Sequence, residues 1–320
     1  MDVSNSFNSL FLRKNMYKIA DYVEVKEESN HFQLSYRKIW KIKKSAEIQK
    51  VIYKICTEGM EDEELKRTSI FKFLIKNKLI HKVSTNNIIN PKTEYYFQNI
   101  CSNADQVIKE LMNKKICIVG LGGVGTQILQ HLCGMNIKNY LLIDYDNVEK
   151  TNLNRQFIYG YEDIGRSKVD ICERYIKNHV IDFKKIIKIK EKIQNPNQLI
   201  NNIYKFDPAI IICAADQPQG KIQSIINIVG KKMNIPVISG GVGPDFASYG
   251  FSEKNSMKTL KEKNVIHKRQ VTFGSFGPTN SFLSAMMAHD IIMKLCNKSC
   301  WAPNHRTIAI DFKTLNIHIL

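Results

Sequence analysis

The chain has 320 residues, 43% of them hydrophobic and 24% charged, which is typical of a globular protein with about two domains. No signal-peptide core opens the sequence and no run reaches the about 18 apolar residues of a membrane span, so we expect a cytoplasmic protein without a membrane partner. The net charge of +17 comes from lysines spread along the chain, which fits a Lys-rich solvated surface or a preference for anions, and no nucleic-acid-binding signature accompanies it.

Residues 1–90 are predicted to form a separate, small winged-helix-like α+β module. The runs YVEVK (22–26) and HFQLSY (31–36) have the composition of strands and could offer an unpaired sheet edge. Ser45 is a candidate N-cap of a first helix whose apolar residues recur with the helical period, and the acidic start of 60–77 predicts a second helix. Such a module could pack a dimer or bind DNA.

In the second predicted domain, residues 91–320, strands and helices alternate, which predicts a Rossmann-like, doubly wound and mostly parallel α/β sheet. The expected strands are KICIVG (115–120), NYLLID (139–144), KIIKIKEK (185–192), AIIICAAD (209–216), IPVIS (235–239), RTIAID (306–311) and LNIHIL (315–320). The expected helices begin near 126, cover 168–179 and 219–233, and begin again at about Asn280. A Gly-rich bend follows IPVIS, and a charged loop occupies 253–270.

The first of these strands runs into a turn that fits G-x-G-x-x-G, with glycines at Gly120, Gly122, Gly123 and Gly125. Such a turn lets the backbone approach phosphates, and the helix that follows offers them its N-terminal N–H groups. The next strand ends in Asp144, where an acid that binds ribose hydroxyls is expected. These features alone would suit a dinucleotide-dependent dehydrogenase.

Polar residues after the second strand favour a triphosphate instead. Asn152, Arg155 and Gln156 follow it, and Lys168 opens the next predicted helix. Two cations beside a glycine turn suit the charge of ATP better than that of a dinucleotide, and no P-loop motif occurs elsewhere. Asp216 ends a later strand, at the edge where ligands bind such sheets, and is a candidate magnesium ligand; its alternative role is a helix cap.

As a set, these motifs resemble those of the ubiquitin-activating-enzyme-like (ThiF–MoeB) family of adenylating enzymes. The set comprises the glycine turn, DxD at 144–146, NLxRQ at 152–156, a GxxK ending at Lys168 and the strand ending at Asp216. The resemblance extends from about Lys115 to Leu295.

The resemblance implies ATP and Mg²⁺ as cofactors and assigns roles to the motif residues. Asp144 would bind the ribose, and Asp146 would belong to the same ATP site as the four glycines. Asn152, Arg155, Gln156 and Lys168 would surround the phosphates, and Asp216 would hold the metal. Arg155, Lys168 and Asp216 would then be the catalytic residues of an attack by a carboxylate on the α-phosphate of ATP, with release of pyrophosphate.

The N-terminal module is most similar to that of the microcin C adenylating branch of this family. That branch implies a homodimer and a ribosomally made precursor peptide, whose leader the module would hold by strand addition. The reaction would then adenylate a peptide carboxylate in antibiotic biosynthesis, leading to cyclisation or nucleotide attachment. The alternatives are activation of a ubiquitin-like sulfur-carrier protein, or a non-catalytic nucleotide- or DNA-binding module.

Two departures from the family bear on these expectations. None of the eight cysteines forms a C-x-x-C pair, and none lies in the loop after 253, so we expect neither zinc nor a thioester relay. Dimeric relatives reach an Arg from before the first strand into the partner's site, whereas this chain has no Arg between Arg67 and Arg155. Lys92 and an Arg nearer the N-terminus are candidate substitutes, and an active site that differs from the family's is the alternative.

Overall fold

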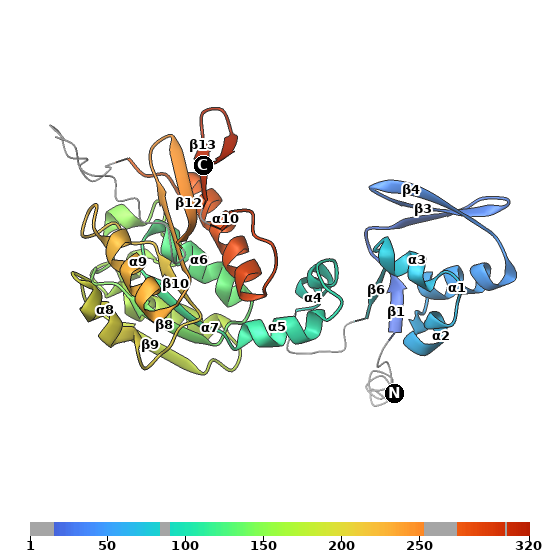
Figure 1. The fold of residues 1–320 in the computed structure, drawn as a ribbon, viewed down its shortest axis with the longest axis horizontal. Coiled ribbons are helices and arrows are strands. Elements are labelled where there is room, and N and C mark those ends of the chain that lie inside the picture. The colour runs from blue at the N-terminus through green and yellow to red at the C-terminus, as the bar shows by residue number, and fades with distance from the viewer. Residues whose placement is uncertain (1–15, 84–89, 253–273, 305) are drawn as a thin grey trace. The chain divides into compact units, whose positions relative to one another are not determined.

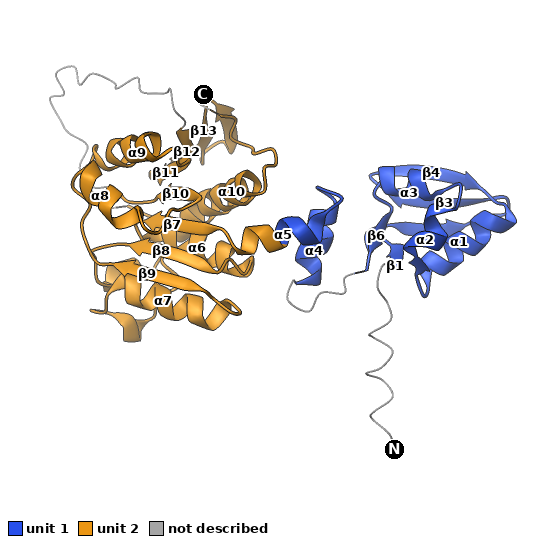
Figure 2. Cartoon of the chain, turned by 60° about the horizontal axis from the view of Figure 1, so that its bottom comes forward, with its two compact units in different colours: residues 1–108 blue, residues 109–320 orange. Residues whose placement is uncertain are grey.

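The computed structural model describes residues 16–83, 90–252, 274–304 and 306–320. Contacts between residues divide the chain into unit 1, residues 1–108, and unit 2, residues 109–320 (Figure 2). Each unit has its own cluster of buried apolar side chains.

Unit 1 is an α+β module built on two small antiparallel sheets. The first has the order β5–β1–β6 (Met60–Glu61, Met16–Ile19, Ile80–Lys82), and the second the order β2–β3–β4 (Glu24–Glu27, His31–Tyr36, Lys38–Lys43). The helices are α1 (Ala46–Cys56), α2 (Asp62–Lys66), α3 (Phe71–Lys76) and α4 (Pro91–Gln98), and α5 (Ala104–Met112) spans the division between the units.

Helix α1 forms as its sequence predicts. Ser45 Oγ accepts a hydrogen bond from Ile48 N at 3.1 Å and so satisfies one of the free N–H groups of the first turn. The apolar face of the helix, with Val51, Ile52 and Ile55 almost fully buried, packs into the core of unit 1. This burial fixes the helix on the two sheets.

Two expectations for this unit are wrong. The single helix over 60–77 is two helices, because Thr68 Oγ1 bonds to Leu65 O and Ser69 N donates to the Glu47 carboxylate at 2.8 Å, which captures groups that a continuous helix would use. The run HFQLSY (31–36) cannot offer a free edge, because it is the central strand of its sheet and pairs on both sides.

Unit 2 contains an eight-stranded sheet of order β14–β13–β12–β11–β10–β7–β8–β9 (Figure 1). The strands are β7 (Lys115–Val119), β8 (Asn139–Ile143), β9 (Lys185–Ile189), β10 (Ile210–Cys213), β11 (Val237–Val242), β12 (Phe246–Ser252), β13 (Thr307–Asp311) and β14 (Asn316–Ile319). Strands β7 to β11 pair in parallel, and β12 to β14 continue the sheet antiparallel. The predicted doubly wound, mostly parallel fold is confirmed.

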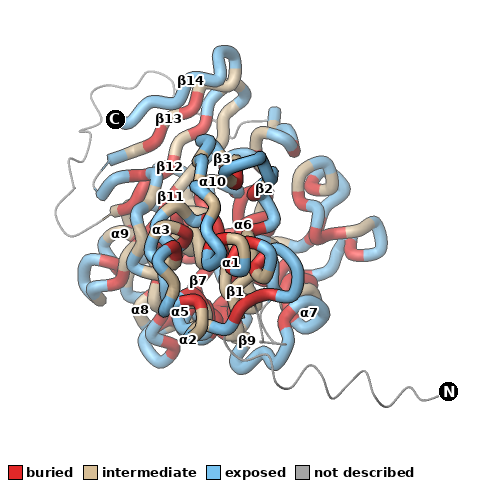
Figure 3. The backbone as a smooth tube through the Cα atoms, turned by 90° about the vertical axis from the view of Figure 1, so that its right-hand side faces the viewer, coloured by how far each residue is buried: buried red, intermediate tan, exposed pale blue. Residues whose placement is uncertain are grey.

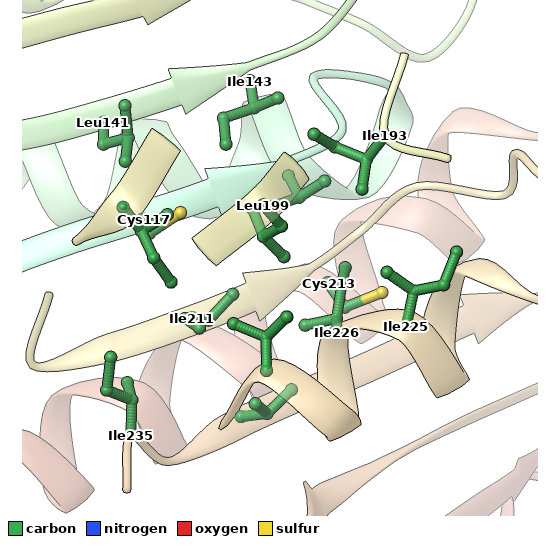
Figure 4. Close-up of a cluster of buried hydrophobic side chains, with 14 of the residues drawn as sticks. Cys117, Leu141, Ile143, Ile193, Leu199, Ile211, Cys213, Ile225, Ile226 and Ile235 are labelled. Carbon is green, nitrogen blue, oxygen red and sulfur yellow. The ribbon is translucent and has the colours of Figure 1, made fainter. Parts of the chain in front are cut away.

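Five α-helices and two short 3₁₀ helices accompany this sheet in the described part of unit 2. They are α6 (Gly123–Gly134), α7 (Lys168–His179), α8 (Pro196–Ile203), α9 (Ile222–Met233) and α10 (Gly277–Leu295), with 3₁₀ turns at Lys150–Asn152 and Tyr161–Asp163. Helices α8 and α9 bury their apolar residues against one face of β7, β8, β10 and β11 (Figure 4), while α10 and α7 both contact α6. None of the helices in the described ranges is long and apolar enough to cross a membrane.

The central strands are almost entirely buried, as their Ile- and Leu-rich runs predict. The edge strand β14 is exposed instead (Figure 3). The Gly-rich bend expected directly after IPVIS lies later in the chain, at 243–245, because β11 continues through Gly240 to Val242. A Cβ on Gly240 would lie 2.5 Å from Met287 Sδ, so this glycine allows α10 to pass close to the strand. The charged loop at 253–270 lies outside the described residues.

Candidate active site

The strand order places the predicted motifs at one edge of the sheet. Strands β7 and β10 are neighbours, although β8 and β9 follow β7 in the chain, so the winding direction reverses between them. Open α/β sheets bind ligands at the carboxyl ends of the strands at such a switch point. The glycine turn follows β7, and Asp216 follows β10 at this same point.

The glycine turn is shaped by two close backbone approaches. Gly120 has a φ of +94°, and a Cβ on it would lie 2.5 Å from Ala215 N in the segment after β10. A Cβ on Gly125 would overlap the carbonyl oxygen of Gly120. Helix α6 then starts at Gly123 with Gly122 as its N-cap, and no side chain caps its free N–H groups. Its first turn can therefore donate hydrogen bonds to an anion.

The Asp144 carboxylate is buried and tied to the glycine turn. Its Oδ2 accepts from Leu121 N at 2.6 Å, and its Oδ1 accepts from Asp146 N at 2.8 Å. Burial raises the pKa of Asp144 above its usual value, and the Lys168 ammonium and the two backbone bonds partly oppose that rise. Each oxygen keeps a lone pair for a further donor, such as a hydroxyl group.

Lys168 is a buried cation, with 5% of its surface exposed. It begins α7, and its Nζ lies 2.9 Å from Asp146 Oδ2, whose side chain is 43% exposed. A buried ammonium requires such a partner, because desolvation otherwise disfavours its charged form. The sequence predicts both residues to belong to one ATP site, and the structure shows that they pair with each other.

The loop over 150–160 carries the three other predicted phosphate residues. Arg155 lies against the glycine turn, its Cγ 3.2 Å from where a Cβ on Gly123 would be. Gln156 is buried near Gly122, and its Oε1 has no hydrogen-bond partner in the described part of the chain. Asn152 Oδ1 instead accepts from Glu149 N at 3.0 Å in the capping box of a 3₁₀ turn, so that oxygen supports the loop.

Asp216 is exposed at the end of the segment after β10. Partial burial raises the pKa of the Tyr145 phenol, and the negative charges of Asp146, Asp216 and Asp144 add to that rise. Within the described ranges no three His, Cys, Asp or Glu side chains are placed to hold a metal ion by themselves.

Three buried polar residues complete the site and escaped the sequence reasoning. Asn280 in the first turn of α10 contacts the glycine turn, and a Cβ on Gly123 would overlap its Oδ1. Gln127 Nε2 donates to Arg155 O at 2.9 Å, and Tyr159 OH donates to Leu121 O at 2.9 Å. The sequence identified Asn280 only as the approximate start of a helix, because other polar residues also occur along that helix.

The cysteines in the sheet and its helices are poor nucleophiles in this environment. Cys117, Cys133, Cys172 and Cys213 are buried. Burial raises the pKa of the Cys133, Cys172 and Cys213 thiols to about 12, so these side chains stay protonated at neutral pH.

In unit 1 the second sheet presents β4 as a basic edge strand. Lys44 N donates to Asn30 O at 3.0 Å. This bond makes Lys44 and Asn30 a hydrogen-bonded pair, and such pairs alternate with non-hydrogen-bonded pairs along an antiparallel ladder. The N–H groups of Ile39, Lys41 and Lys43 therefore point away from β3. A surface recess of about 360 Å³ lies beside the start of this strand, lined by Tyr22, Ser35, Tyr36, Arg37, Lys38 and Ile39.

Comparisons with known proteins place the chain among adenylating enzymes. The ThiF family model matches residues 93–320. A stretch of 66 residues is 41% identical to the NEDD8-activating enzyme E1 catalytic subunit of Drosophila melanogaster, which covers 21% of this chain and 15% of the relative. A stretch of 169 residues is 28% identical to the adenylyltransferase and sulfurtransferase UBA4 of Meyerozyma guilliermondii, which covers 50% of this chain and 38% of the relative. The chain thus spans well under half of each of these two proteins.

Solved structures match over nearly the whole chain. E. coli MccB with ATP covers 95% of this chain and 96% of its own, with a TM-score of 0.75 and 22% identity. E. coli MccB with AMPCPP and MccA gives a TM-score of 0.73 at 22% identity and the same coverage. PaaA covers 94% and 98%, with a TM-score of 0.71 and 18% identity. These likenesses show a shared fold.

Proposed function

Because the chain belongs to the ThiF family, we propose that it is an ATP-dependent adenylyltransferase that activates a carboxylate of a ribosomally made precursor peptide. The observation that carries this proposal is the gathering of the glycine turn, Arg155, the Lys168–Asp146 pair and Asp216 around one switch point of the sheet. That arrangement offers free N–H groups and two cations where a triphosphate would bind.

In the proposed reaction a carboxylate oxygen of the peptide attacks the α-phosphorus of ATP. The bond between that phosphorus and the bridging oxygen breaks, pyrophosphate leaves with the electron pair, and a peptidyl adenylate forms. Arg155 and Lys168 offset charge that develops on the phosphates, and this kind of preorganised stabilisation is commonly the largest contribution to such catalysis. Asp144 would orient the nucleotide through its ribose hydroxyls.

Asp216 would hold the magnesium ion that accompanies ATP. A magnesium ion in such sites takes most of its ligands from phosphate and water and needs only one or two carboxylates, so an exposed Asp216 at the switch point fits it. The bound ion would neutralise phosphate charge. The remaining work of orienting the reactants falls to the side chains of this chain.

Unit 1 would hold the leader of the precursor on the β4 edge. A peptide strand pairing with the outward N–H groups of Ile39, Lys41 and Lys43 gains affinity through its backbone, and the recess beside β4 can take one of its side chains. The lysines of β4 favour an acidic leader, whereas the other edge strand, β2, carries Glu24 and Glu27. E. coli MccB, which shares the fold over both units, has been solved with MccA.

The peptidyl adenylate would be captured in one of two ways, and its products belong to peptide antibiotic biosynthesis. A nucleophile of the same peptide closes a succinimide or another ring with loss of AMP, or the nucleotide becomes attached to the peptide. A homodimer is part of the proposal, with a cation of the partner serving because this chain has no Arg between Arg67 and β7. Neither nucleic acid nor membrane is a proposed partner.

A second candidate is activation of the C-terminus of a ubiquitin-like sulfur-carrier protein, which the similarity to adenylyltransferase and sulfurtransferase UBA4 favours. A non-catalytic nucleotide- or DNA-binding role is the alternative of a different class. Pyrophosphate release with Mg·ATP separates the three when measured with a precursor peptide, with a sulfur carrier and with neither. Release that depends on the precursor supports the proposal; release only with the carrier, or none at all, overturns it.

A further inference from the structure

A chain of hydrogen bonds joins the NLxRQ loop to the start of α10. Asn154 Nδ2 donates to Ser275 O at 2.8 Å, across 121 positions of sequence. Asn280 Nδ2 donates to Ser275 Oγ at 3.1 Å and to Phe276 O at 2.8 Å. We refer to Asn154, Ser275 and Asn280 together as the asparagine bridge.

One end of the bridge holds the Arg155 guanidinium. Asn154 Oδ1 accepts from Arg155 Nη1 at 2.8 Å, and the same nitrogen donates to Thr151 O at 2.9 Å. In the part of the chain that the structure describes, Arg155 Nε and Nη2 make no hydrogen bond. The Nη1 side of the guanidinium is therefore held by the protein, while Nε and Nη2 can bind a phosphate.

The other end of the bridge, Asn280, lies against the glycine turn. Asn280 is 4% exposed, and a Cβ on Gly123 would overlap its Oδ1. The Arg155 Cγ lies 3.2 Å from the same hypothetical Cβ. Gly123, the first residue of α6, therefore lies against the side chains of Asn280 and Arg155, which the bridge connects.

We propose that Asn154 and Asn280 are positioning residues that hold Arg155 over the glycine turn for the phosphates of the nucleotide. An unrestrained arginine loses rotamer freedom when it binds, at a cost of about 0.5–1.5 kcal/mol for each immobilised side chain. The bridge imposes that order before the nucleotide arrives. The inference rests on the proposed function, because it concerns nucleotide binding at that site.

The test is calorimetric binding of Mg·ATP and, separately, of adenosine to the full-length protein. Asn154→Ala should weaken Mg·ATP binding about 2- to 13-fold, the range that the ordering cost implies, and leave adenosine binding unchanged because adenosine has no phosphate. Asn280→Ala should act in the same direction. Asn201→Ala, which removes an exposed asparagine of α8, is the matched control and should change neither affinity.

A double-mutant cycle separates positioning of Arg155 from general stabilisation. In an Arg155→Ala background, Asn154→Ala should change Mg·ATP affinity by less than about twofold, because the residue acts through Arg155. An undiminished loss in that background would overturn the proposal, as would wild-type affinity in both folded single variants. Loss of the cooperative unfolding transition in both would assign the bridge to stability alone and overturn it as well. A wild-type protein that fails to bind Mg·ATP refutes the proposed function itself, and that outcome is distinguishable from the others.

Discussion

Replacing Lys168 by methionine separates the chemical role of this cation from its structural one. The side chain is 5% exposed and pairs at 2.9 Å with Asp146, whose own side chain is 43% exposed. Methionine fills the same space without a charge, and Asp146 regains water, so the free energy of unfolding should change by only about 1 kcal/mol. Turnover should fall roughly 10²-fold or more, equivalent to about 2.7 kcal/mol of transition-state stabilisation.

The assay is pyrophosphate release with Mg·ATP and the precursor peptide, with urea unfolding measured on the same samples. Lys177→Met is the matched control, because Lys177 lies on the same helix in a surface ion pair with Glu173. This control should retain turnover. Near-full turnover of a folded Lys168→Met variant would remove the residue from the phosphate site.

The same variant has a consequence for pH. The Lys168 charge lowers the pKa of Asp144, against the rise that burial causes, so its loss should move that pKa further above the usual value. A carboxyl group with a raised pKa in the folded state becomes protonated at higher pH, which removes an acceptor for ribose hydroxyls. Adenosine binding by Lys168→Met should therefore weaken at a higher pH than wild-type binding does as the solution is acidified. Identical profiles would contradict the coupling.

The remaining predictions address other parts of the site. Arg155→Ala should lower turnover roughly 10²-fold, whereas the exposed Arg166→Ala should not; equal effects would argue against a phosphate contact. Asp216→Ala should lower turnover and raise the magnesium concentration needed for half-maximal rate, and Asp170→Ala, which removes a surface partner of Lys188, should leave that requirement unchanged. Replacing all eight cysteines by Ser or Ala should lower stability, because four of them are buried, and should leave adenylation activity intact. A peptide thioester trapped on any Cys of the wild type, or stoichiometric zinc, would contradict this prediction. Lys41→Pro removes an outward N–H of β4 and should raise the KM for the precursor far more than the KM for ATP. Lys41→Ala keeps that N–H and should have a smaller effect. Equal changes in the two KM values would refute edge binding.

The fold of unit 2 could be predicted because its parallel strands are buried on both faces and read as apolar runs between helical patterns. Strand β12, FASYGFS, was missed because small residues, including a Gly, separate its aromatic residues, and its place in the sheet depends on pairing with β11 and β13. The break between α2 and α3 depends on a long-range bond from Ser69 to Glu47. Such contacts leave no periodic trace in a sequence.

The sequence predicts which residues belong to the candidate site better than it predicts the contacts between them. Spacing alone identified the glycine turn, Asp144 and Lys168, because each follows a strand or opens a helix at the sheet edge. The pairing of Lys168 with Asp146 and the approach of Asn280 to Gly123 arise from tertiary packing. Asn152 supports its loop through Glu149, an interaction that its place in a family motif did not indicate.

The central claim is attack at the α-phosphorus of ATP by a peptide carboxylate. It is tested most directly by incubating the protein with ATP labelled at the α-phosphate, Mg²⁺ and a candidate precursor peptide, and separating the products. The account predicts precursor-dependent label in AMP or in a peptide–nucleotide product, with an equal amount of pyrophosphate. Label that appears in ADP with release of orthophosphate, or that stays in ATP, would contradict it.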